Sequence, residues 1–408
     1  MRENPAPEGY YRRGLGLKAQ VQPVLESEYG SALVRAIKEG GYELSAGRIR
    51  FRLARSLGFC YGVDRAVEYA YETCEKFPGR RIYLVGEIIH NPLVNRQLQD
   101  IGVEFLYPDG AGRFDFSGIR PDDVVIIPAF GVKLEDFRSL RAIGCVLVDT
   151  TCGSVLNVWK RVETYSRDGF TSIIHGKYDH EETRATSSQV RKHEGGCYLI
   201  VRDMDEAERV CAFIEGRLGA DELGRAFRDR CSEGFDPERD LGKIGVANQT
   251  TMLASESLAI ADRLREAVSR RYGEADLPRR FRSFDTICSA TQDRQDAVLE
   301  LMRRPPDLMI VVGGYNSSNT SHLAHLCAAR TRTYHIESPA CIDPEAGTIS
   351  HKRIPDEAIV VESGWLPDGD VQIGLTAGAS TPDSMIGQTV ERIFRMIGAD
   401  PAEVLAAS

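Results

Sequence analysis

The 408-residue sequence lacks any long apolar run. Its longest hydrophobic stretches, such as Val124–Ile127 and Leu308–Val312, have the length of single strands, whereas a membrane-crossing helix needs about 20 apolar residues. The first residues also lack the charged-then-apolar layout of a secretory signal, and they include acidic residues that transit peptides avoid. We therefore expect a cytoplasmic protein that does not span a membrane.

An excess of positive charge is also absent. The formal net charge is −9, with 51 Lys and Arg against 60 Asp and Glu, which disfavours sequence-independent binding to nucleic acid. The content of 42% hydrophobic and 27% charged residues is typical of a globular protein. At roughly 150 residues per domain the chain is long enough for two or three domains, and we expect three.

The ten cysteines include no Cys-x-x-Cys pair. This absence argues against zinc ribbons and against thioredoxin-like redox sites, both of which need such local pairs. In a chain of this size without an export signal, we expect thiols or metal ligands rather than disulfides. If several of the cysteines bind one metal, they meet only in the folded protein.

From Ile49 onward the sequence alternates between short apolar runs and amphipathic stretches, which is typical of βα units with largely parallel sheets. The predicted fold class is therefore α/β. Before this region, residues 1–50 form an extension for which we expect one helix over residues 25–38, ended near Gly40. The predicted strands cover residues 81–85, 124–127, 146–148, 172–174, 197–201, 244–246, 308–312 and 371–375.

Three cysteines share a local pattern. At Cys60, Cys152 and Cys288 a strand-like run ends at the cysteine and a helix-like stretch follows directly. Ligand sites of open α/β sheets lie beyond the carboxyl ends of strands, where helix N-termini point their amide groups. Three such units around a pseudo-threefold axis would bring the thiolates to one point. The alternative for any single cysteine is a small buried residue at a strand end.

Polar side chains follow several predicted strands. His90 is placed to donate a hydrogen bond to an anion, although a single histidine at a strand end is also a common structural residue. The segment 175–183 concentrates imidazole, ammonium and carboxylate groups, which favours Glu182 as a proton donor oriented by His180. A zinc site and a solvated loop are the alternatives for this segment.

Two further loops have the composition of phosphate sites. Residues 313–321 contain glycines, hydroxyls and amides between a strand and a helix expected from His322, and residues 376–383 repeat this composition with Ser380 as a donor. The sequence contains neither a P-loop nor a dinucleotide-binding motif there. The segment 248–251, Asn-Gln-Thr-Thr, follows another strand, and its hydroxyls either relay a proton or cap a helix.

Together, these segments resemble the 4-hydroxy-3-methylbut-2-enyl diphosphate reductases, the LytB-type family that ends the non-mevalonate isoprenoid pathway. The resemblance rests on motifs that occur in family order from about residue 50 to 395. They are Gly-Phe-Cys-x-Gly-Val-x-Arg-Ala, Glu-Ile-Ile-His-Asn, Asp-Thr-Thr-Cys, His-Glu-Glu-Thr, Gln-Thr-Thr, Thr-Ile-Cys-x-Ala-Thr-x-x-Arg-Gln, Asn-Ser-Ser-Asn-Thr and Thr-Ala-Gly-Ala-Ser-Thr-Pro-Asp.

The resemblance implies three α/β domains related by a pseudo-threefold axis around one central [4Fe–4S] cluster. Cys60, Cys152 and Cys288 are its implied ligands, which leaves the fourth iron open toward the substrate. The expected bounds are an N-terminal extension over 1–50, domains over 51–148, 149–284 and 285–395, and a tail over 396–408.

The resemblance also implies the roles of the polar residues. Glu182 is the expected proton donor, oriented by His180, and Thr250 lies beside the reacting hydroxyl. The implied reaction is a two-electron reductive dehydroxylation that gives isopentenyl and dimethylallyl diphosphates, with electrons delivered singly by ferredoxin or flavodoxin. No nicotinamide, nucleic-acid or membrane partner is expected. The residues expected to bind diphosphate are His90, His180, Ser317, Ser318, Asn319 and Ser380.

One loop departs from the family pattern. Many bacterial members have Ser-Ala-His-Gly where this chain has Pro-Ala-Phe-Gly, and Phe130 has no donor for diphosphate. This loop and the N-terminal extension resemble the plant and cyanobacterial branch.

The family's His-x-Glu spacing favours Glu182 over the adjacent Glu181 as the proton donor. His175 and Lys177 either line the site or support it.

Two other classes of protein share single features with this sequence. Quinolinate synthase is another three-cysteine cluster enzyme of trefoil shape, but its motifs are not those of this sequence. A cluster-based redox sensor that catalyses nothing would not need Glu182, Thr250 and two phosphate-type loops.

The remaining cysteines lie outside the shared pattern and are expected to be ordinary thiols: Cys74, Cys145, Cys197, Cys211, Cys231, Cys327 and Cys341.

Overall fold

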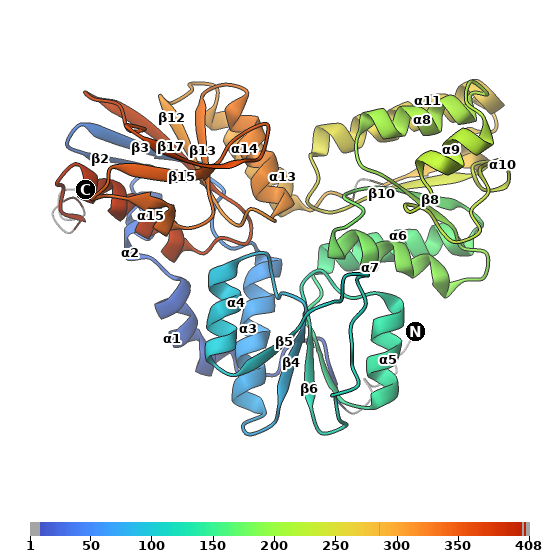
Figure 1. Ribbon diagram of the computed structural model, residues 1–408, viewed down its shortest axis with the longest axis horizontal. Coiled ribbons are helices and arrows are strands. Elements are labelled where there is room, and N and C mark those ends of the chain that lie inside the picture. Colours follow the sequence, from blue (N-terminus) through green and yellow to red (C-terminus); the bar gives the residue numbers. More distant parts are fainter. Residues whose placement is uncertain (1–8, 285, 402–403, 405–408) are drawn as a thin grey trace. The chain divides into compact units, whose positions relative to one another are not determined.

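Helices and strands alternate along the chain, and the strands form three sheets (Figure 1). The computed structural model describes residues 9–284, 286–401 and 404. Contacts group the chain into two compact units: the first takes its described residues from 1–13, 77–88 and 102–288, and the second from 14–76, 89–101 and 289–408. The predicted α/β class is confirmed.

The first sheet belongs to the first unit and is fully parallel, in the order β1-β7-β6-β4-β5. The inner strands β4 and β6 are buried at every position, because strands covered on both faces need continuous apolar runs. Helix α5 (Leu134–Ile143) follows β6. The strand bounds are Tyr10–Tyr11 for β1, Ile82–Val85 for β4, Val103–Leu106 for β5, Val124–Ile127 for β6 and Val146–Asp149 for β7.

The second sheet, also in the first unit, is parallel in the order β11-β10-β8-β9. Its inner strands β8 (Thr171–His175) and β10 (Ile244–Asn248) are buried throughout, and their register pairs His175 with Asn248. The ends of both strands therefore lie at the same edge of the sheet. The other elements are α6 (Gly153–Arg167), α7 (Glu181–Ser188), β9 (Tyr198–Val201), α8 (Met204–Ile214), α9 (Ala220–Ala226), α10 (Pro237–Asp240), α11 (Ala254–Tyr272), α12 (Leu277–Arg280) and β11 (Phe281–Ser283).

The third sheet belongs to the second unit and has eight strands. Its centre is parallel, in the order β13-β12-β17-β3, while β2, β14, β15 and β16 are antiparallel additions. The strand bounds are Glu43–Ala46 for β2, Ile49–Leu53 for β3, Leu308–Val312 for β12, Arg332–Ile336 for β13, Ile342–Asp343 for β14, Thr348–Lys352 for β15, Ile359–Ser363 for β16 and Val371–Ala377 for β17. The helices of this unit are α1 (Lys18–Tyr29), α2 (Ala32–Glu39), α3 (Tyr61–Lys76), α4 (Pro92–Asp100), α13 (Ser289–Leu301), α14 (Ser318–Ala328) and α15 (Asp383–Met396).

All eight predicted strands are present, with ends shifted by two residues or fewer. The single helix predicted over residues 25–38 is wrong, because α1 ends at Tyr29 and α2 begins at Ala32. Gly30 has an extended backbone there, and the Ser31 hydroxyl caps α2 by accepting from the Val34 amide at 3.3 Å.

Three other predicted boundaries are also wrong. The strands expected to end at Cys60 and at Cys288 end earlier, since β3 stops at Leu53 and β11 stops at Ser283. Helix α14 begins at Ser318 rather than at His322, because Ser317 accepts from the Thr320 amide and so starts the helix earlier. Among the described residues, none of the helices combines the length and the apolar character that crossing a membrane requires. The predicted domain boundaries stay a prediction.

Candidate functional site

The three cysteines of the shared pattern each stand directly before a helix. Cys60 precedes α3, Cys152 is the N-cap residue of α6, and Cys288 precedes α13. Helix N-termini carry partial positive charge, which favours the thiolate that binds metals. All ten cysteines lie within the described residues, and none of them is in a disulfide. Cys152 and Cys288 belong to the first unit and Cys60 to the second.

The segment that leads to Cys288 is tied to the end of β10. The Thr286 hydroxyl donates to Asn248 Oδ1 at 2.6 Å and accepts from the Asn248 amide at 3.0 Å. Two residues further on, the Cys288 amide lies 3.4 Å from the Thr250 carbonyl oxygen. Asn248 is buried, so this pair fixes the approach to Cys288 with short, shielded hydrogen bonds.

The segment that leads to Cys60 is tied to the loop after β17. The Cys60 amide donates to the Ala379 carbonyl at 3.1 Å, and Arg294 donates to the Gly58 carbonyl at 2.6 Å. Gly58 has φ +88°, and a Cβ there would overlap Asp383 Oδ1. Only glycine fits this position without strain, which explains the Gly-Phe-Cys motif.

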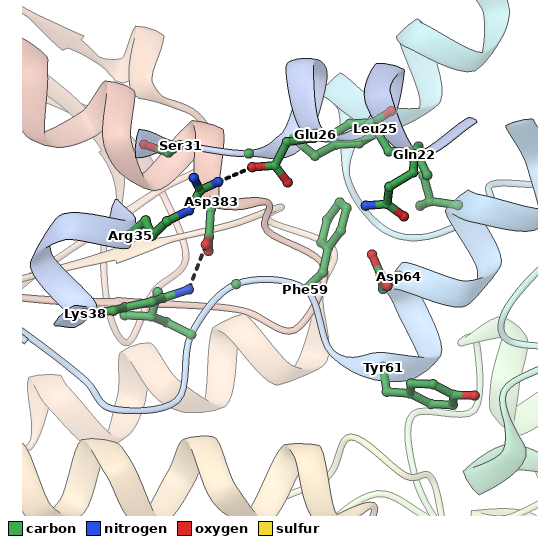
Figure 2. A pocket seen from close by; sticks show the side chains of 15 residues that line it. Gln22, Leu25, Glu26, Ser31, Arg35, Lys38, Phe59, Tyr61, Asp64 and Asp383 are labelled. Carbon is green, nitrogen blue, oxygen red and sulfur yellow. Dashed lines mark hydrogen bonds and ion pairs between the residues drawn. The ribbon is translucent and has the colours of Figure 1, made fainter. Parts of the chain in front are cut away.

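A cavity of about 460 Å³ borders this Cys60 segment (Figure 2). The side chains around it are mostly paired with one another: Lys38 binds Asp383 at 2.7 Å, and Arg35 binds Glu26. The opposite wall carries Phe59, next to Cys60 in the chain. Because Lys38 and Arg35 are each paired with a carboxylate and Asp64 adds a further acidic group, this cavity is a poor match for a diphosphate.

The N-terminus of α7 presents the carboxylate for which a catalytic role was predicted. Helix α7 begins at Glu181, so the segment is not the extended loop that would turn adjacent side chains to opposite faces. Glu181 is exposed, whereas Glu182 is 1% exposed. Thr250 contacts both oxygens of Glu182, through its amide at 2.6 Å and its hydroxyl at 3.0 Å. The structure therefore joins Glu182 to Thr250, whereas Glu181 is an exposed residue of the same helix start.

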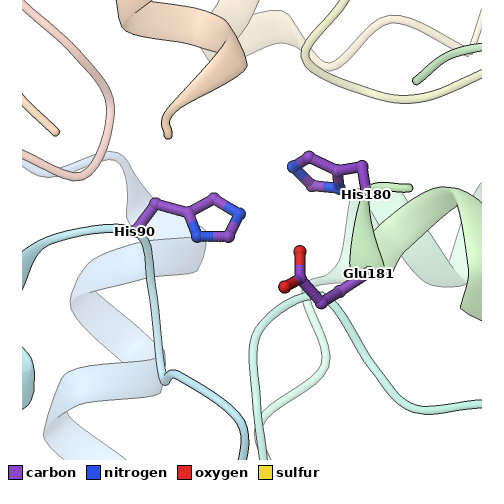
Figure 3. A group of neighbouring side chains, drawn as sticks. All are labelled: His90, His180 and Glu181. Atoms are coloured by element: carbon purple, nitrogen blue, oxygen red, sulfur yellow. The ribbon is translucent and has the colours of Figure 1, made fainter. Parts of the chain in front are cut away.

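His180 lies at the start of α7 (Figure 3), where two contacts fix it. Its Nδ1 accepts from the Glu182 amide at 3.1 Å, which makes His180 the N-cap of α7. The ring of Phe130 packs edge-on against the imidazole, with centroids 5.6 Å apart and planes at 82°. Phe130 thus supplies no donor, but its ring supports the orientation of His180.

Gln249 connects the two segments of this part of the site. Its Oε1 accepts from the Lys177 amide and from the Thr183 hydroxyl, both at 3.1 Å, and its Nε2 donates to the Thr251 hydroxyl at 2.7 Å. Gln249 is 1% exposed. The loop before α7 is therefore held to the loop after β10 through one buried amide side chain.

His175 supports this region rather than lining it. The residue is fully buried at the end of β8, and its Nδ1 lies 2.8 Å from the Ser257 hydroxyl of α11. Burial lowers the pKa of His175 from 6.5 to about 4, so the imidazole stays neutral at neutral pH. A neutral, enclosed imidazole is suited to packing and not to proton transfer.

The second unit gathers the other predicted polar residues. His90, which Figure 3 labels, lies before α4, and its carbonyl accepts from the Ser380 hydroxyl at 3.2 Å. Asn91 Nδ2 donates to the Ser380 carbonyl at 2.7 Å. A Cβ at Gly314 would lie 2.6 Å from the His90 carbonyl oxygen, so glycine is needed for this close approach. These loops bring His90 and Ser380 together.

The start of α14 adds amide and hydroxyl groups to this second unit. Asn319 Oδ1 accepts from the Ala379 amide at 3.0 Å, while Asn319 Nδ2 is buried without a hydrogen-bond partner among the described residues. Ser317 caps the helix, and Ser318 is 2% exposed. Buried donors at a helix N-terminus are suited to an anion.

Sequence reasoning assigned no role to three residues that the structure places in these networks. Thr286, Asn248 and Gln249 were visible only as members of motifs, because their partners lie in other strands and loops. The one usable signal was position: Asn248 is the last residue of β10, Gln249 follows it directly, and Thr286 lies three residues before the start of α13.

Parallel sheets with polar side chains at their strand ends, and with thiols at three helix starts, are typical of an α/β enzyme. The family described as LytB protein matches residues 51–394. The chain belongs to this family.

Curated relatives match nearly the whole chain. The 4-hydroxy-3-methylbut-2-enyl diphosphate reductase of Gloeobacter violaceus is 46% identical over 395 residues, which is 96% of this chain and 93% of the relative. The enzyme of the same name from Parasynechococcus marenigrum is 46% identical over 388 residues, 95% of this chain and 96% of the relative. These relatives agree with the predicted cyanobacterial branch.

Two solved structures are also similar. A structure of (E)-4-hydroxy-3-methyl-but-2-enyl diphosphate reductase, described as the terminal enzyme of the non-mevalonate pathway, is 27% identical with a TM-score of 0.51, covering 84% of this chain and 98% of that one. The reductase structure from Plasmodium falciparum is 22% identical with a TM-score of 0.62, covering 86% and 89%. The second likeness concerns the fold alone.

Proposed function

We propose that this chain is a 4-hydroxy-3-methylbut-2-enyl diphosphate reductase. It removes the allylic hydroxyl of its substrate as water, using two electrons and two protons, and gives isopentenyl and dimethylallyl diphosphates. The observation that carries this proposal is membership in the LytB family, with relatives of that name 46% identical over nearly the full chain. This step ends the non-mevalonate isoprenoid pathway.

The family implies an iron–sulfur cofactor. Its proposed form is one [4Fe–4S] cluster with three ligands, Cys60, Cys152 and Cys288. The donor set fits, because thiolates are the usual ligands of such clusters and these thiols stand at helix N-termini outside any disulfide. When bound, a cluster with one open iron supplies single electrons and a Lewis acid for a hydroxyl group.

The residues of the first unit handle the proton. Glu182 donates it to the departing hydroxyl, and Thr250, which contacts both Glu182 oxygens, keeps the carboxyl group aimed. His180 caps α7 and so fixes the backbone from which Glu182 projects. Burial of Glu182 and Thr250 keeps bulk water away from this pair.

The diphosphate is proposed to bind through charge-assisted hydrogen bonds, which orient the alcohol end of the substrate. Supporting this assignment are the buried Nδ2 of Asn319 and the helix start beside it. The proposed contacts are His90, His180, Ser317, Ser318, Asn319 and Ser380.

Ferredoxin or flavodoxin is the proposed electron donor, delivering electrons one at a time. The cytoplasmic location expected from the sequence stays a prediction. A cluster-based redox sensor is the alternative function, but a sensor does not need the buried Glu182–Thr250 pair.

The proposal is tested with protein purified without oxygen. We expect about four iron and four sulfide per chain, and turnover of the hydroxylated diphosphate with a reduced dye. Replacing Cys152 with Ser should remove both the cluster absorption and the turnover. Iron without turnover would favour the sensor, and a Cys152→Ser variant that keeps its cluster would contradict the ligand assignment.

A further inference from the structure

The N-terminal extension contributes a strand to the sheet that leads to Cys152. Strand β1 pairs in parallel with β7, with Tyr10 opposite Leu147, and the Leu147 amide donates to the Gly9 carbonyl at 2.7 Å. Strand β7 ends at Asp149, three residues before Cys152. The extension lies outside the segment 51–394 that the family shares.

The side chain of Tyr10 is held against α5. Its ring lies edge-on to Phe137, with centroids 6.1 Å apart, and the Arg141 guanidinium lies 5.8 Å from its centroid. These contacts fix the direction of the phenol hydroxyl, because an aromatic ring packed on two sides has little rotational freedom. The ring is therefore positioned independently of what its hydroxyl binds.

The Tyr10 hydroxyl donates to Asp149 Oδ2 at 2.5 Å. The other oxygen of Asp149 accepts from both the amide and the hydroxyl of Thr151, at 3.0 and 2.5 Å. An aspartate that accepts from the amide two residues on forms a tight local turn. The turn sets the direction in which the chain enters Cys152, whose amide donates to the Ala129 carbonyl at 3.0 Å.

Charge and burial keep the Tyr10 hydroxyl as the donor and the Asp149 carboxylate as the acceptor. Asp149 is 5% exposed. Burial and the neighbouring Asp149 carboxylate raise the pKa of Tyr10 well above its usual value, so the phenol remains a donor across the working pH range. The hydrogen bond between Tyr10 and Asp149 therefore persists while the phenol stays protonated.

We propose that Tyr10 is a positioning residue that holds the Cys152 loop through Asp149 and Thr151, and that this is one task of the N-terminal extension. The inference rests on the proposed function, in which Cys152 binds the cluster. A residue outside the shared family segment thereby sets the geometry of one ligand. Groups that orient metal ligands typically change metal retention when they are replaced.

The effect on the cluster is separable from an effect on folding. A cavity of about 300 Å³ borders Tyr10, Asp149 and Thr151, so water can replace the lost hydroxyl in Tyr10→Phe and relieve the unpaired oxygen of Asp149. The phenylalanine ring keeps the contacts with Phe137 and Arg141. We therefore expect little change in the thermal midpoint of the protein and a clear change in the geometry of the Cys152 loop.

The experiment compares Tyr10→Phe with Tyr11→Phe in the full chain. Tyr11 is the matched control, since it is the other residue of β1 and packs against Phe77 instead. The measurements are the rate of iron loss to a chelator, the electron paramagnetic resonance spectrum of the reduced cluster, and the thermal midpoint of the iron-free protein. We expect about tenfold faster iron loss and an altered spectrum in Tyr10→Phe only, with equal midpoints.

A second comparison tests the route through Asp149. In an Asp149→Asn background, Tyr10→Phe should add less than about twofold to the rate of iron loss, because the two residues act as one unit. The inference is overturned if Tyr10→Phe and Tyr11→Phe lose iron at the same rate and share one spectrum, or if the two substitutions act additively. Failure of the proposed function would look different: the wild-type protein would bind no iron, or Cys152→Ser would retain it.

Discussion

Thr250 donates to both carboxylate oxygens of Glu182, from its amide at 2.6 Å and from its hydroxyl at 3.0 Å. Both residues are buried. Glu182 lies in the first turn of α7, which follows β8, and Thr250 lies in the loop after β10, and these two strands pair in parallel. The carboxyl group is thus held on two sides by a single residue. Its orientation depends on this pair, whereas its capacity to give a proton depends on Glu182 alone.

Replacing Glu182 with Gln should separate these two properties. Glutamine keeps the shape and one acceptor for the Thr250 amide, but it has no acidic proton. We expect turnover to fall by about 100-fold or more, while iron content and substrate binding stay unchanged. The control is Glu266→Gln, an exposed carboxylate on α11 of the same unit, which should stay within about twofold of wild type. Near-normal steady-state rates in Glu182→Gln would contradict the assignment.

Replacing His90 with Ala should weaken substrate binding. The imidazole is lost, but the backbone carbonyl that accepts from Ser380 remains, so the loop keeps its anchor. A hydrogen bond to a charged group contributes about 1.5–3 kcal/mol, which corresponds to a KM increase of roughly 10- to 150-fold. Iron content is measured in parallel. Loss of iron with an unchanged KM would instead make His90 a structural residue.

Replacing Thr286 with Val should loosen the approach to Cys288. Valine has the same shape, but it cannot donate to Asn248 Oδ1 or accept from the Asn248 amide. We expect iron loss to a chelator about tenfold faster than in wild type. Thr286→Ser retains the hydroxyl and should behave as wild type. Equal rates in the two variants would show that the hydroxyl is not involved.

Burial of His175 should lower the free energy of unfolding of the first unit at acidic pH. Its pKa falls from 6.5 to about 4 because the ring is buried. Between these values the unfolded chain takes up a proton that the folded chain does not, so the stabilising contribution is complete above pH 6.5 and is lost as the pH falls towards 4. The loss reaches about 1.4 kcal/mol per pH unit.

Urea unfolding of the iron-free protein measures this effect. His175→Asn cannot be protonated, and its free energy of unfolding should change less than that of wild type between about pH 7 and about pH 5. Parallel changes in the two proteins would mean that His175 already titrates normally in the folded state.

Three of the cysteines outside the shared pattern should be unreactive in the folded protein. Burial raises the pKa of Cys74 to about 11 and that of Cys211 and Cys327 to about 12. Alkylation requires the thiolate, so iodoacetamide should label these three only after unfolding. Serine at any one of them should leave the visible absorption of the cluster unchanged. Rapid labelling of Cys327 in the folded protein would contradict this expectation.

Strand positions were predictable because buried parallel strands have a simple signature. Val124–Ile127 and Leu308–Val312 are continuous apolar runs, and both strands have the predicted bounds. The Glu182–Thr250 neighbourhood was also foreseeable, since the carboxyl ends of parallel strands meet at one sheet edge. What the sequence did not indicate was that Thr250 contacts both oxygens of the same carboxylate.

The N-terminal region could not be predicted from local sequence patterns. Strand β1 has two residues, and it exists only because it pairs with β7, far along the chain. A run this short has no periodicity to detect. The break at Gly30 was missed for a related reason: the glycine lies inside a helical pattern, and only the Ser31 cap reveals the start of a second helix. Local patterns do not encode contacts between distant segments.

The pairing of β3 with β17 has a consequence for synthesis of the chain on the ribosome. Strand β3 ends at Leu53, whereas β17 begins at Val371, and at about 5–20 residues per second the intervening chain of roughly 300 residues takes about 15–60 s to make. Until then the edge of β3 that pairs with β17 has no strand partner, and an unpaired strand edge is a site for misassembly. The second sheet, whose strands lie between Thr171 and Ser283, has no such delay. The second unit therefore completes its folding last, after its C-terminal strand has left the exit tunnel.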